Sequence, residues 1–175
     1  DRPTGTDKLH MLSLGAMAHF DLNQAGAHSY EQALQVVRRL GLPMADLEQL
    51  YRRMVFNVVA RNQDDHVKNI AFLMDRRGRW SLAPAFDVTY AYNPAGRWTG
   101  QHQMTLNGKQ RGFTLEDFRA CARSASMKRG RADTILAEVQ ARVRRWADYA
   151  DEAGVQAEHR DRIEPALRVT AFPPR

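Results

Sequence analysis

The stretch "NVVARNQDDHVKNIAFLMDRRGRWSLAPAFD", residues 57–87, decides the fold. Its apolar start gives way to a polar cluster, "QDDHVKN" at 63–69, and two short apolar runs follow on either side of "RRGR". Short apolar runs separated by a turn that contains glycine predict a β-hairpin, here with Gly78 in the turn. The segment therefore predicts a helix end, a polar loop and a hairpin, in that order.

Apolar residues at helical spacing predict helices on both sides of this segment. Ser29 and Gln32 have the spacing of an N-terminal capping box, and Thr114 and Asp117 form a similar pair. The expected fold is mainly α, a helical bundle with a small central β-hairpin. The predicted helices span residues 7–21, 30–40, 44–62, 115–125, 131–154 and 157–171, the last interrupted at Pro165, and a long loop at 90–112 is expected to hold one strand at 102–106.

Length and composition fit one domain, or one lobe of a larger protein, with 175 residues of which 43% are hydrophobic. No apolar run approaches the roughly 18 residues that a membrane span needs, so no membrane contact is expected. Cys121 is the only cysteine, so no internal disulfide is expected, and a reducing cytoplasm is the natural compartment. The net charge of +6 favours anionic partners such as nucleotides, nucleic acid or an acidic protein.

The polar cluster has the residue types of a phosphoryl-transfer site. Asp64 and Asn69 have the D-x-x-x-x-N spacing of the protein-kinase catalytic loop, where Asp accepts the substrate hydroxyl proton and Asn binds magnesium. Asp87 ends the second hairpin strand, so the hairpin would return it beside Asn69 as a second magnesium ligand. His66 and Lys68 would donate to phosphate or orient the loop.

Several separated motifs resemble the core of the HipA-like kinases, the toxin kinases of bacterial type II toxin–antitoxin systems. The resemblance extends to "KLHMLSLGAMAH" upstream and "HQMTLNGK" downstream, and covers roughly residues 8–150. It implies a protein-kinase-like C-terminal lobe that uses ATP and Mg²⁺. The residues that carry it are Asn57, Asn62, Asp64, His66, Lys68 and Asn69, followed by Pro84, Phe86 and Asp87.

The resemblance also implies roles for individual residues. Asp64 is expected to be the catalytic residue, and Asn69 and Asp87 the metal ligands. Phe86 stands beside the nucleotide where relatives often have Tyr. The turn expected to contact ATP comprises His66, Val67, Lys68 and Asn69.

Asp65 stands where some relatives have glycine. Its carboxylate would bind the metal, repel phosphate or point to solvent, and the sequence leaves these three alternatives open.

The N-terminal lobe of the family carries its phosphate-binding loop, its autophosphorylated serine and its ATP-binding lysine. No glycine-rich phosphate loop and no V-A-I-K lysine occur in this sequence. Residues 1–175 are therefore expected to form a C-terminal kinase lobe without the N-terminal lobe, with residues 155–175 as its final helix and tail. Such a lobe alone is expected to be inactive.

The expected activity is that of a serine/threonine protein kinase and toxin. The resemblance implies a helix-turn-helix antitoxin as partner, DNA phosphate contacts within a toxin–antitoxin complex, and a protein substrate, with an aminoacyl-tRNA synthetase as one candidate. Alternatives are a small-molecule kinase, a lobe that binds nucleotide without turnover, and a non-catalytic module that binds an antitoxin or DNA. The candidate residues for DNA or partner contact are Arg123, Lys128 and Arg129, within a basic run that also has the character of a solvated face.

Several of these residues also have a purely structural interpretation. Asp64 could be an exposed loop acid, His66 could cap backbone groups in the turn, and Lys68 could be a surface charge. Asn57 and Asn62 are expected to brace the loop through hydrogen bonds. His102, Asp117 and Cys121 are not expected to form a triad or metal site, and Cys121 is expected to be buried.

Overall fold

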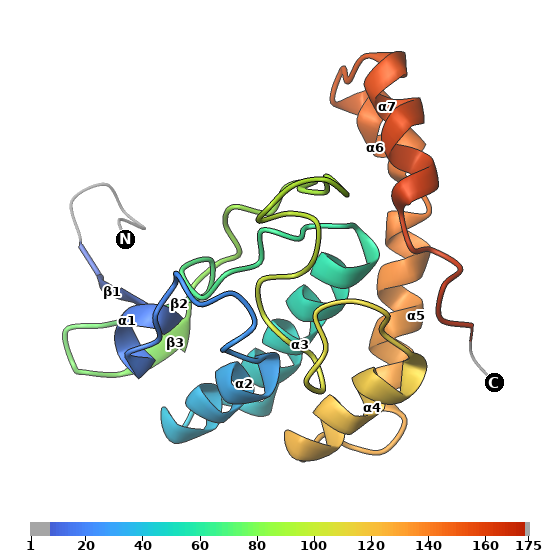
Figure 1. Cartoon of the computed structure of the whole chain (residues 1–175). Coiled ribbons are helices and arrows are strands. Elements are labelled where there is room, and N and C mark those ends of the chain that lie inside the picture. The colour runs from blue at the N-terminus through green and yellow to red at the C-terminus, as the bar shows by residue number, and fades with distance from the viewer. Residues whose placement is uncertain (1–7, 174–175) are drawn as a thin grey trace.

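The computed structural model describes residues 8–173 and shows a mainly helical fold around a small antiparallel sheet (Figure 1). The prediction of a mainly α fold with a small central β element is confirmed. In chain order the elements are β1 (His10–Ser13), α1 (Leu14–Ala18), α2 (Tyr30–Arg39), α3 (Met44–Val59), β2 (Ala71–Met74), β3 (Trp80–Leu82), α4 (Leu115–Ser124), α5 (Arg131–Val143), α6 (Trp146–Glu152), α7 (Ala157–Ile163) and a 3₁₀ turn (Glu164–Ala166).

The sheet has three strands in the order β1-β2-β3, rather than the two of a hairpin. The helix predicted over residues 7–21 is wrong at residues 10–13, which form strand β1. This strand pairs antiparallel with β2, and Met11 lies opposite Leu73. Residue 7 lies outside the described residues. Ser13 then caps the short α1 by accepting from the backbone N–H of Ala16 at 3.2 Å. Pairing with a strand about 60 residues away overrides the local helical spacing.

The predicted helix starts of α2 and α4 are confirmed. Ser29 and Gln32 exchange both bonds of a capping box, and Thr114 and Asp117 do the same. Such caps satisfy backbone N–H groups that a helix start otherwise leaves unpaired, typically worth about 1 kcal/mol each.

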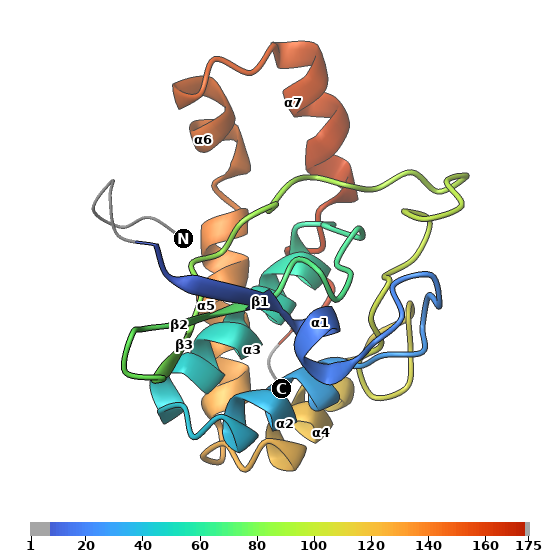
Figure 2. The ribbon, with the colours of Figure 1, turned by 90° about the vertical axis from the view of Figure 1, so that its left-hand side faces the viewer.

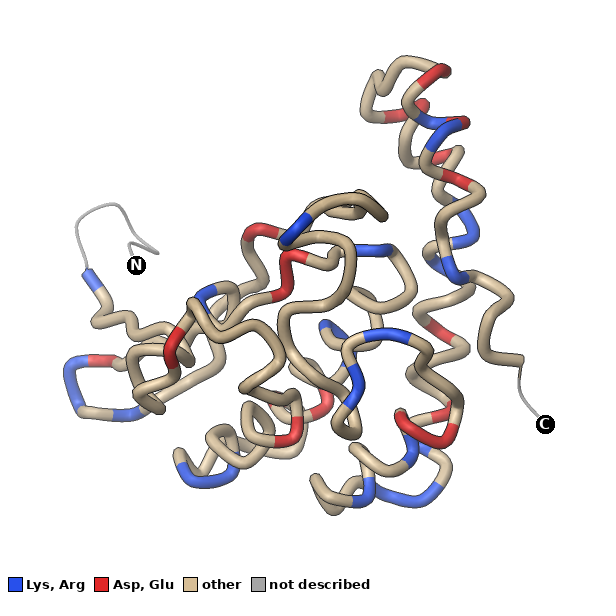
Figure 3. The backbone as a smooth tube through the Cα atoms, in the orientation of Figure 1, with Lys and Arg blue, Asp and Glu red and all other residues tan. Residues whose placement is uncertain are grey.

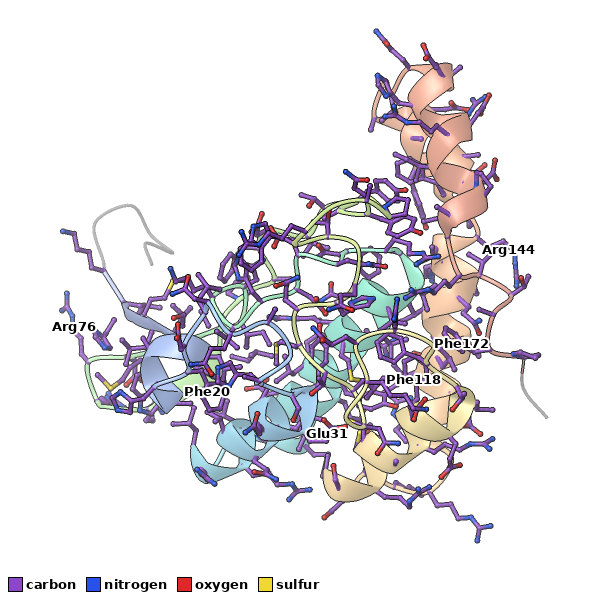
Figure 4. All side chains as sticks on the ribbon, viewed as in Figure 1. Phe20, Glu31, Arg76, Phe118, Arg144 and Phe172 are labelled. Atoms are coloured by element: carbon purple, nitrogen blue, oxygen red, sulfur yellow. The ribbon has the colours of Figure 1, made fainter. Side chains whose placement is uncertain are left out.

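The core lies between α2, α3, α4 and α5, with α3 at its centre. Leu50, Met54 and Val58 of α3 are fully buried, as is Ile135 of α5. Burying such side chains stabilises the fold by about 1.5–3 kcal/mol each. The C-terminal segment closes this core, where Phe172 packs edge-on against Phe118 with ring centroids 5.0 Å apart (Figure 4).

The single helix predicted over residues 131–154 is wrong, because the chain turns at Arg144 and Arg145 between α5 and α6. The N–H of Arg145 bonds the carbonyl of Arg142, three residues back, which tightens the end of α5. The indole N–H of Trp146 donates to the carbonyl of Arg160 at 3.1 Å and so joins α6 to α7. These two helices form an arm that stands away from the rest of the molecule (Figures 1 and 2).

The interruption predicted at Pro165 is confirmed, because α7 ends at Ile163 and Pro165 lies in the 3₁₀ turn. The continuation of this helix to residue 171 is wrong, because residues 167–171 are not helical. The strand predicted at 102–106 is wrong, because this segment makes only isolated bridges, Thr105 to Ser29 and Leu106 to Lys109. The end of the predicted C-terminal tail, residues 174 and 175, lies outside the described residues. No helix in residues 8–173 has the length and apolar character to cross a membrane.

Candidate catalytic cleft

The polar loop between α3 and β2 is held at both ends by backbone hydrogen bonds. Arg61 adopts a left-handed φ of 61° just after α3, and Gln63 N–H then bonds the carbonyl of Ala91 at 3.0 Å. Leu14 and Gly15 donate to the carbonyls of Ile70 and Val67 at the far end. The loop is therefore fixed between α1 and the segment that follows β3.

A tight turn sets the position of Asp64 relative to Asn69. The carbonyl oxygen of Asp64 accepts from the N–H of His66 at 2.9 Å and from the side-chain amide of Asn69 at 3.0 Å. The N–H of Asn69 bonds the carbonyl of His66 at 3.0 Å. The five-residue spacing between Asp64 and Asn69 thus has a structural cause, because the Asn69 amide closes the turn that begins at Asp64.

Asp87 lies just after β3, in a left-handed conformation with φ 53°. Such a conformation is uncommon outside glycine and, where it occurs, often marks a functional position. Asn62 brings Asp87 toward the polar loop, because its amide Nδ2 lies 3.5 Å from the Asp87 carbonyl and 3.1 Å from Asn57 Oδ1. The prediction that Asn57 and Asn62 brace the loop is confirmed.

The polar loop and the segment after β3 line one cleft. The candidate metal ligands Asn69 and Asp87 both belong to it, as do His66 and Phe86. Its other lining residues are Tyr30, Leu50, Arg53, Asn57, Asn62, Asp65, Ile70, Ala85 and Val88.

The donors in this cleft suit a hard cation that is shared with a ligand. Magnesium is usually bound by one or two carboxylates, with water and substrate phosphates filling the other positions. Asp87 supplies a carboxylate and Asn69 an amide oxygen. Among residues 8–173 no group of three or more His, Cys, Asp or Glu that could hold a metal ion is found. Asn69 and Asp87 are the cleft residues that could hold magnesium together with a phosphate ligand.

Three cleft residues carry buried polar atoms without a hydrogen-bond partner in the described chain: Asn62 Oδ1, His66 Nδ1, and Nε and Nη1 of Arg53. Buried polar groups are normally paired, and exceptions concentrate at functional sites. Arg53 uses its third guanidinium nitrogen, Nη2, to bond the carbonyl of Ala83 at 2.7 Å. Burial lowers the pKa of Arg53, against the opposing charge of Asp46. A half-desolvated cation on the cleft wall favours an anionic ligand.

The remaining predicted site residues lie as follows. Asp64 is half-buried and Lys68 is exposed, and neither of them is part of the cleft lining. The Val67 side chain is buried in the core, and its carbonyl accepts from Gly15 at 3.0 Å. Phe86 is 36% exposed on the cleft wall.

Asp65 is buried at 2% exposure, so the alternative that it points to solvent is wrong. It accepts hydrogen bonds from the Tyr30 hydroxyl at 2.6 Å, from His102 Nδ1 at 2.8 Å and from the backbone N–H of Gln103 at 2.8 Å. Burial, reinforced by the charge of Asp65, raises the pKa of Tyr30 well above its usual range. Asp65 therefore ties the polar loop to α2 and to the loop at 102–103.

Arg168 extends this network to the C-terminal segment. Its Nη1 lies 3.1 Å from His102 Nε2 and 3.0 Å from the carbonyl of Val58. A guanidinium only donates, so His102 accepts at Nε2 and carries its proton on Nδ1, facing Asp65. Burial lowers the pKa of Arg168 to about 10, which leaves it a cation at neutral pH. No sequence pattern indicated this role for His102 or Arg168.

The prediction that His102, Asp117 and Cys121 form no common site is confirmed. His102 bonds Asp65, whereas Asp117 pairs with Lys109 at 2.8 Å. Cys121 is fully buried on α4, as predicted.

The basic run on α4 and α5 is interleaved with acidic residues (Figure 3). Arg119 pairs with Asp133 at 2.6 Å and Arg123 with Glu116 at 2.6 Å. Lys128 and Arg129 are exposed in the turn between the two helices. Of the three candidate contact residues, Arg123 thus has its charge matched by an intramolecular partner.

The protein is thus a mainly helical domain with a small antiparallel sheet. Its polar loop supplies the Asn69 amide to the cleft, and the segment after β3 supplies the Asp87 carboxylate. Residues 1–147 match the model of the HipA-like C-terminal domain family. The chain belongs to the HipA-like C-terminal domain family.

A solved structure agrees with this assignment. HipA in the complex of the Shewanella oneidensis MR-1 toxin–antitoxin system HipA, HipB and its operator DNA superposes with a TM-score of 0.75 at 15% identity, over 97% of this chain and 46% of that one. The chain thus spans about half the length of that HipA. No protein with a curated description matches the chain.

Proposed function

We propose that this chain is the C-terminal catalytic lobe of a HipA-like serine/threonine protein kinase, the toxin of a toxin–antitoxin module. It would transfer the γ-phosphoryl group of ATP to a protein hydroxyl. The observation that supports the proposal is the cleft that Asn69 and Asp87 both line, together with the hydrogen bond from the Asn69 amide to the carbonyl of Asp64.

The residues have complementary tasks in this reaction. Asp64 is half-buried and its carboxylate is not held by any side chain in residues 8–173, so it is available to accept the proton of the attacking hydroxyl. Asn69 and Asp87 would hold magnesium, which neutralises charge on the transferred phosphoryl group. Arg53 would donate its unpaired N–H groups to anionic oxygens, and His66 would do so in the tautomer that carries its proton on Nδ1. Phe86 forms part of the wall beside the nucleotide.

The test uses the full-length gene product, labelled ATP, magnesium and a cell extract. Labelled protein bands are expected with the parent protein and are expected to disappear in Asp64→Asn and Asp87→Asn. Asp148→Asn, an exposed carboxylate on α6, is the matched control and should keep its label. Label that persists unchanged in both cleft variants would rule out this assignment. Labelling of a small-molecule acceptor instead of protein would favour a small-molecule kinase on the same fold.

A second function, antitoxin and DNA contact, is favoured by the HipB and operator DNA in the Shewanella complex. Lys128 and Arg129 in the α4–α5 turn would contact DNA phosphates or the antitoxin, and Arg123 would join them only by leaving Glu116. Filter binding to operator DNA with antitoxin present would show a smaller salt dependence for a Lys128→Gln, Arg129→Gln double variant. An unchanged salt dependence would identify this turn as a solvated face.

A further inference from the structure

A second, apolar groove begins where the catalytic cleft ends. Its volume is about 260 Å³, and it runs between α3, α5 and the α6–α7 arm. Val88, the residue after Asp87, lines both the cleft and this groove. The segment after β3 passes beneath the arm, which Figures 1 and 2 show from two sides. An occupant of the groove would therefore emerge beside the candidate metal ligand.

The groove walls are apolar, partly exposed and well supported. Val88 is 46% exposed and Tyr149 is 38% exposed, which is high for large apolar side chains. Trp146, between them, is fixed by its hydrogen bond to the Arg160 carbonyl at 3.1 Å. Exposed apolar surface with a polar rim commonly marks an interaction site.

The rim of the groove is positively charged. Arg142 lines it, and no Asp or Glu of residues 8–173 does. Burial raises the pKa of Tyr90 in the groove wall, and the positive charges of Arg61 and Arg162 oppose that shift. Arg61 bonds the Ala166 carbonyl and Gln63 Oε1 and lies 4.2 Å from the ring centroid of Tyr92, so no carboxylate neutralises it. The groove thus suits an occupant with apolar and acidic groups.

We propose that this groove, lined by Phe56, Val88, Tyr90, Trp146, Tyr149 and Leu167, binds the acceptor polypeptide of the kinase reaction. A protein segment places an apolar side chain in the groove and acidic residues against Arg142, while its Ser or Thr reaches Asp64. The hydroxyl oxygen bonds the γ-phosphorus, the bond from that phosphorus to the bridging oxygen breaks, Asp64 takes the proton and ADP leaves. This inference rests on the proposed function and adds the place where the acceptor binds and the apolar and acidic side chains that it carries.

The test measures binding separately from turnover. Full-length protein carrying Asp64→Asn is titrated with fluorescent serine peptides that have a leucine flanked by glutamates, the same peptide with lysines, or alanine in place of leucine. The Leu/Glu peptide is expected to bind best, and Arg142→Glu should weaken it about tenfold or more, because a favourable charge contact becomes repulsive. Arg39→Glu on α2 is the matched exposed control and should have no effect.

In the protein with Asp64 intact, Arg142→Glu should raise the KM for the peptide, whereas Arg39→Glu should leave that KM unchanged. Equal binding of all three peptides, or no effect of Arg142→Glu, would overturn the inference. If Arg142→Glu changed only antitoxin affinity or only the oligomeric state, the inference would also be overturned. The occupant of the groove would then be the antitoxin or a second copy of the protein. Peptide binding that depends on Arg142 without any phosphorylation would retain the groove and reject only the kinase assignment.

Discussion

Asp65 Oδ2 and His102 Nδ1 are 2.8 Å apart, 37 residues distant in sequence, with both side chains 1% exposed. The pair joins the polar loop, which carries Asp64, to the long loop after β3. Tyr30 and Arg168 complete the network from α2 and the C-terminal segment. Asp65 is therefore the internal anchor of the loop, and Asp64 is the carboxylate to which we assign the proton-accepting role in the proposed function.

Removing Asp65 is expected to be strongly destabilising. Asp65→Ala leaves the Tyr30 hydroxyl, His102 Nδ1 and Gln103 N–H without their acceptor. Each buried donor left without an acceptor typically costs about 1–3 kcal/mol. Urea unfolding of the chain should report that loss in the free energy of unfolding. Asp64→Asn is the neighbouring control and should cost less than about 0.5 kcal/mol. Equal losses for the two variants would contradict the anchoring role.

His102 and Asp65 are expected to be energetically coupled. The double variant Asp65→Ala, His102→Ala should be less destabilised than the sum of the single variants, with a coupling of about 1–3 kcal/mol. The same urea curves provide the measurement. Additive losses would indicate that the hydrogen bond at 2.8 Å contributes little.

Asn69 is expected to act on both the loop and the metal. Asn69→Ala loses both the amide that holds the Asp64 carbonyl and the oxygen proposed to bind the metal, whereas Asn69→Asp keeps an oxygen ligand and loses the donor. In the full-length protein, Asn69→Ala should reduce phosphorylation about 100-fold or more, in the range seen when one electrostatic contact to the reacting group is lost. Asn69→Asp should regain part of the rate at high magnesium concentration. Identical magnesium titrations for the two variants would contradict metal binding by Asn69.

Asp117 is expected to make the fold sensitive to acid. Burial alone would raise the pKa of Asp117, but hydrogen bonds from Lys109, Asn107 and Thr114 outweigh it and lower the pKa to about 2. Because the pKa is lower in the folded state, the stabilisation is present above the unfolded value of 3.8 and is lost as pH falls toward 2.

Urea unfolding of Asp117→Asn and of the parent protein should therefore differ by about 2 kcal/mol at pH 7 and converge between pH 4 and pH 2. The same difference at both ends of that range would contradict this assignment. Asp148→Asn, whose carboxylate is exposed on α6, controls for loss of surface charge.

The Cys121 thiol is expected to be unreactive toward thiol reagents in the folded protein. Burial raises the pKa of its thiol, and its Sγ lies 3.9 Å from Met54 Sδ. The thiolate is the reactive form, so a thiol reagent at pH 8 should label Cys121 no faster than the protein unfolds. Labelling in urea should become fast at the unfolding midpoint. Rapid labelling under native conditions would show that α4 opens locally.

The sequence predicted the parts of the molecule whose cause is local. The capping pairs at Ser29 and Thr114 and the break at Pro165 depend on residues a few positions apart, and they were predicted correctly. Asp64 and Asn69 could be proposed from their spacing and the family resemblance, and Asp87 could be placed beside Asn69 because a hairpin reverses the chain. The cleft that Asn69 and Asp87 share is consistent with that geometry.

The errors have a common physical origin in distant contacts. Residues His10–Ser13 form a strand because β2 offers a pairing edge, which the helical spacing of Leu9 and Leu12 does not reveal. The α5–α6 turn contains no glycine or proline that would predict a break in the helix. It depends on a contact with α7, in which the Trp146 indole N–H bonds the Arg160 carbonyl. Asp65 could not be placed from sequence, because its acceptor role depends on Tyr30 and His102, each more than 30 residues away.

The hairpin also allows residues to be added at its turn without moving the cleft residues at its two ends. Asn69 precedes β2 and Asp87 follows β3, while Met74 pairs with Trp80 at the base of the turn. Gly78, at the tip, has a left-handed φ of 76° and no neighbour within 4 Å of a Cβ placed there. A short epitope or fluorophore tag inserted at this tip would extend outward and leave the distance between Asn69 and Asp87 unchanged. The turn is thus a natural attachment point for following the protein in living cells.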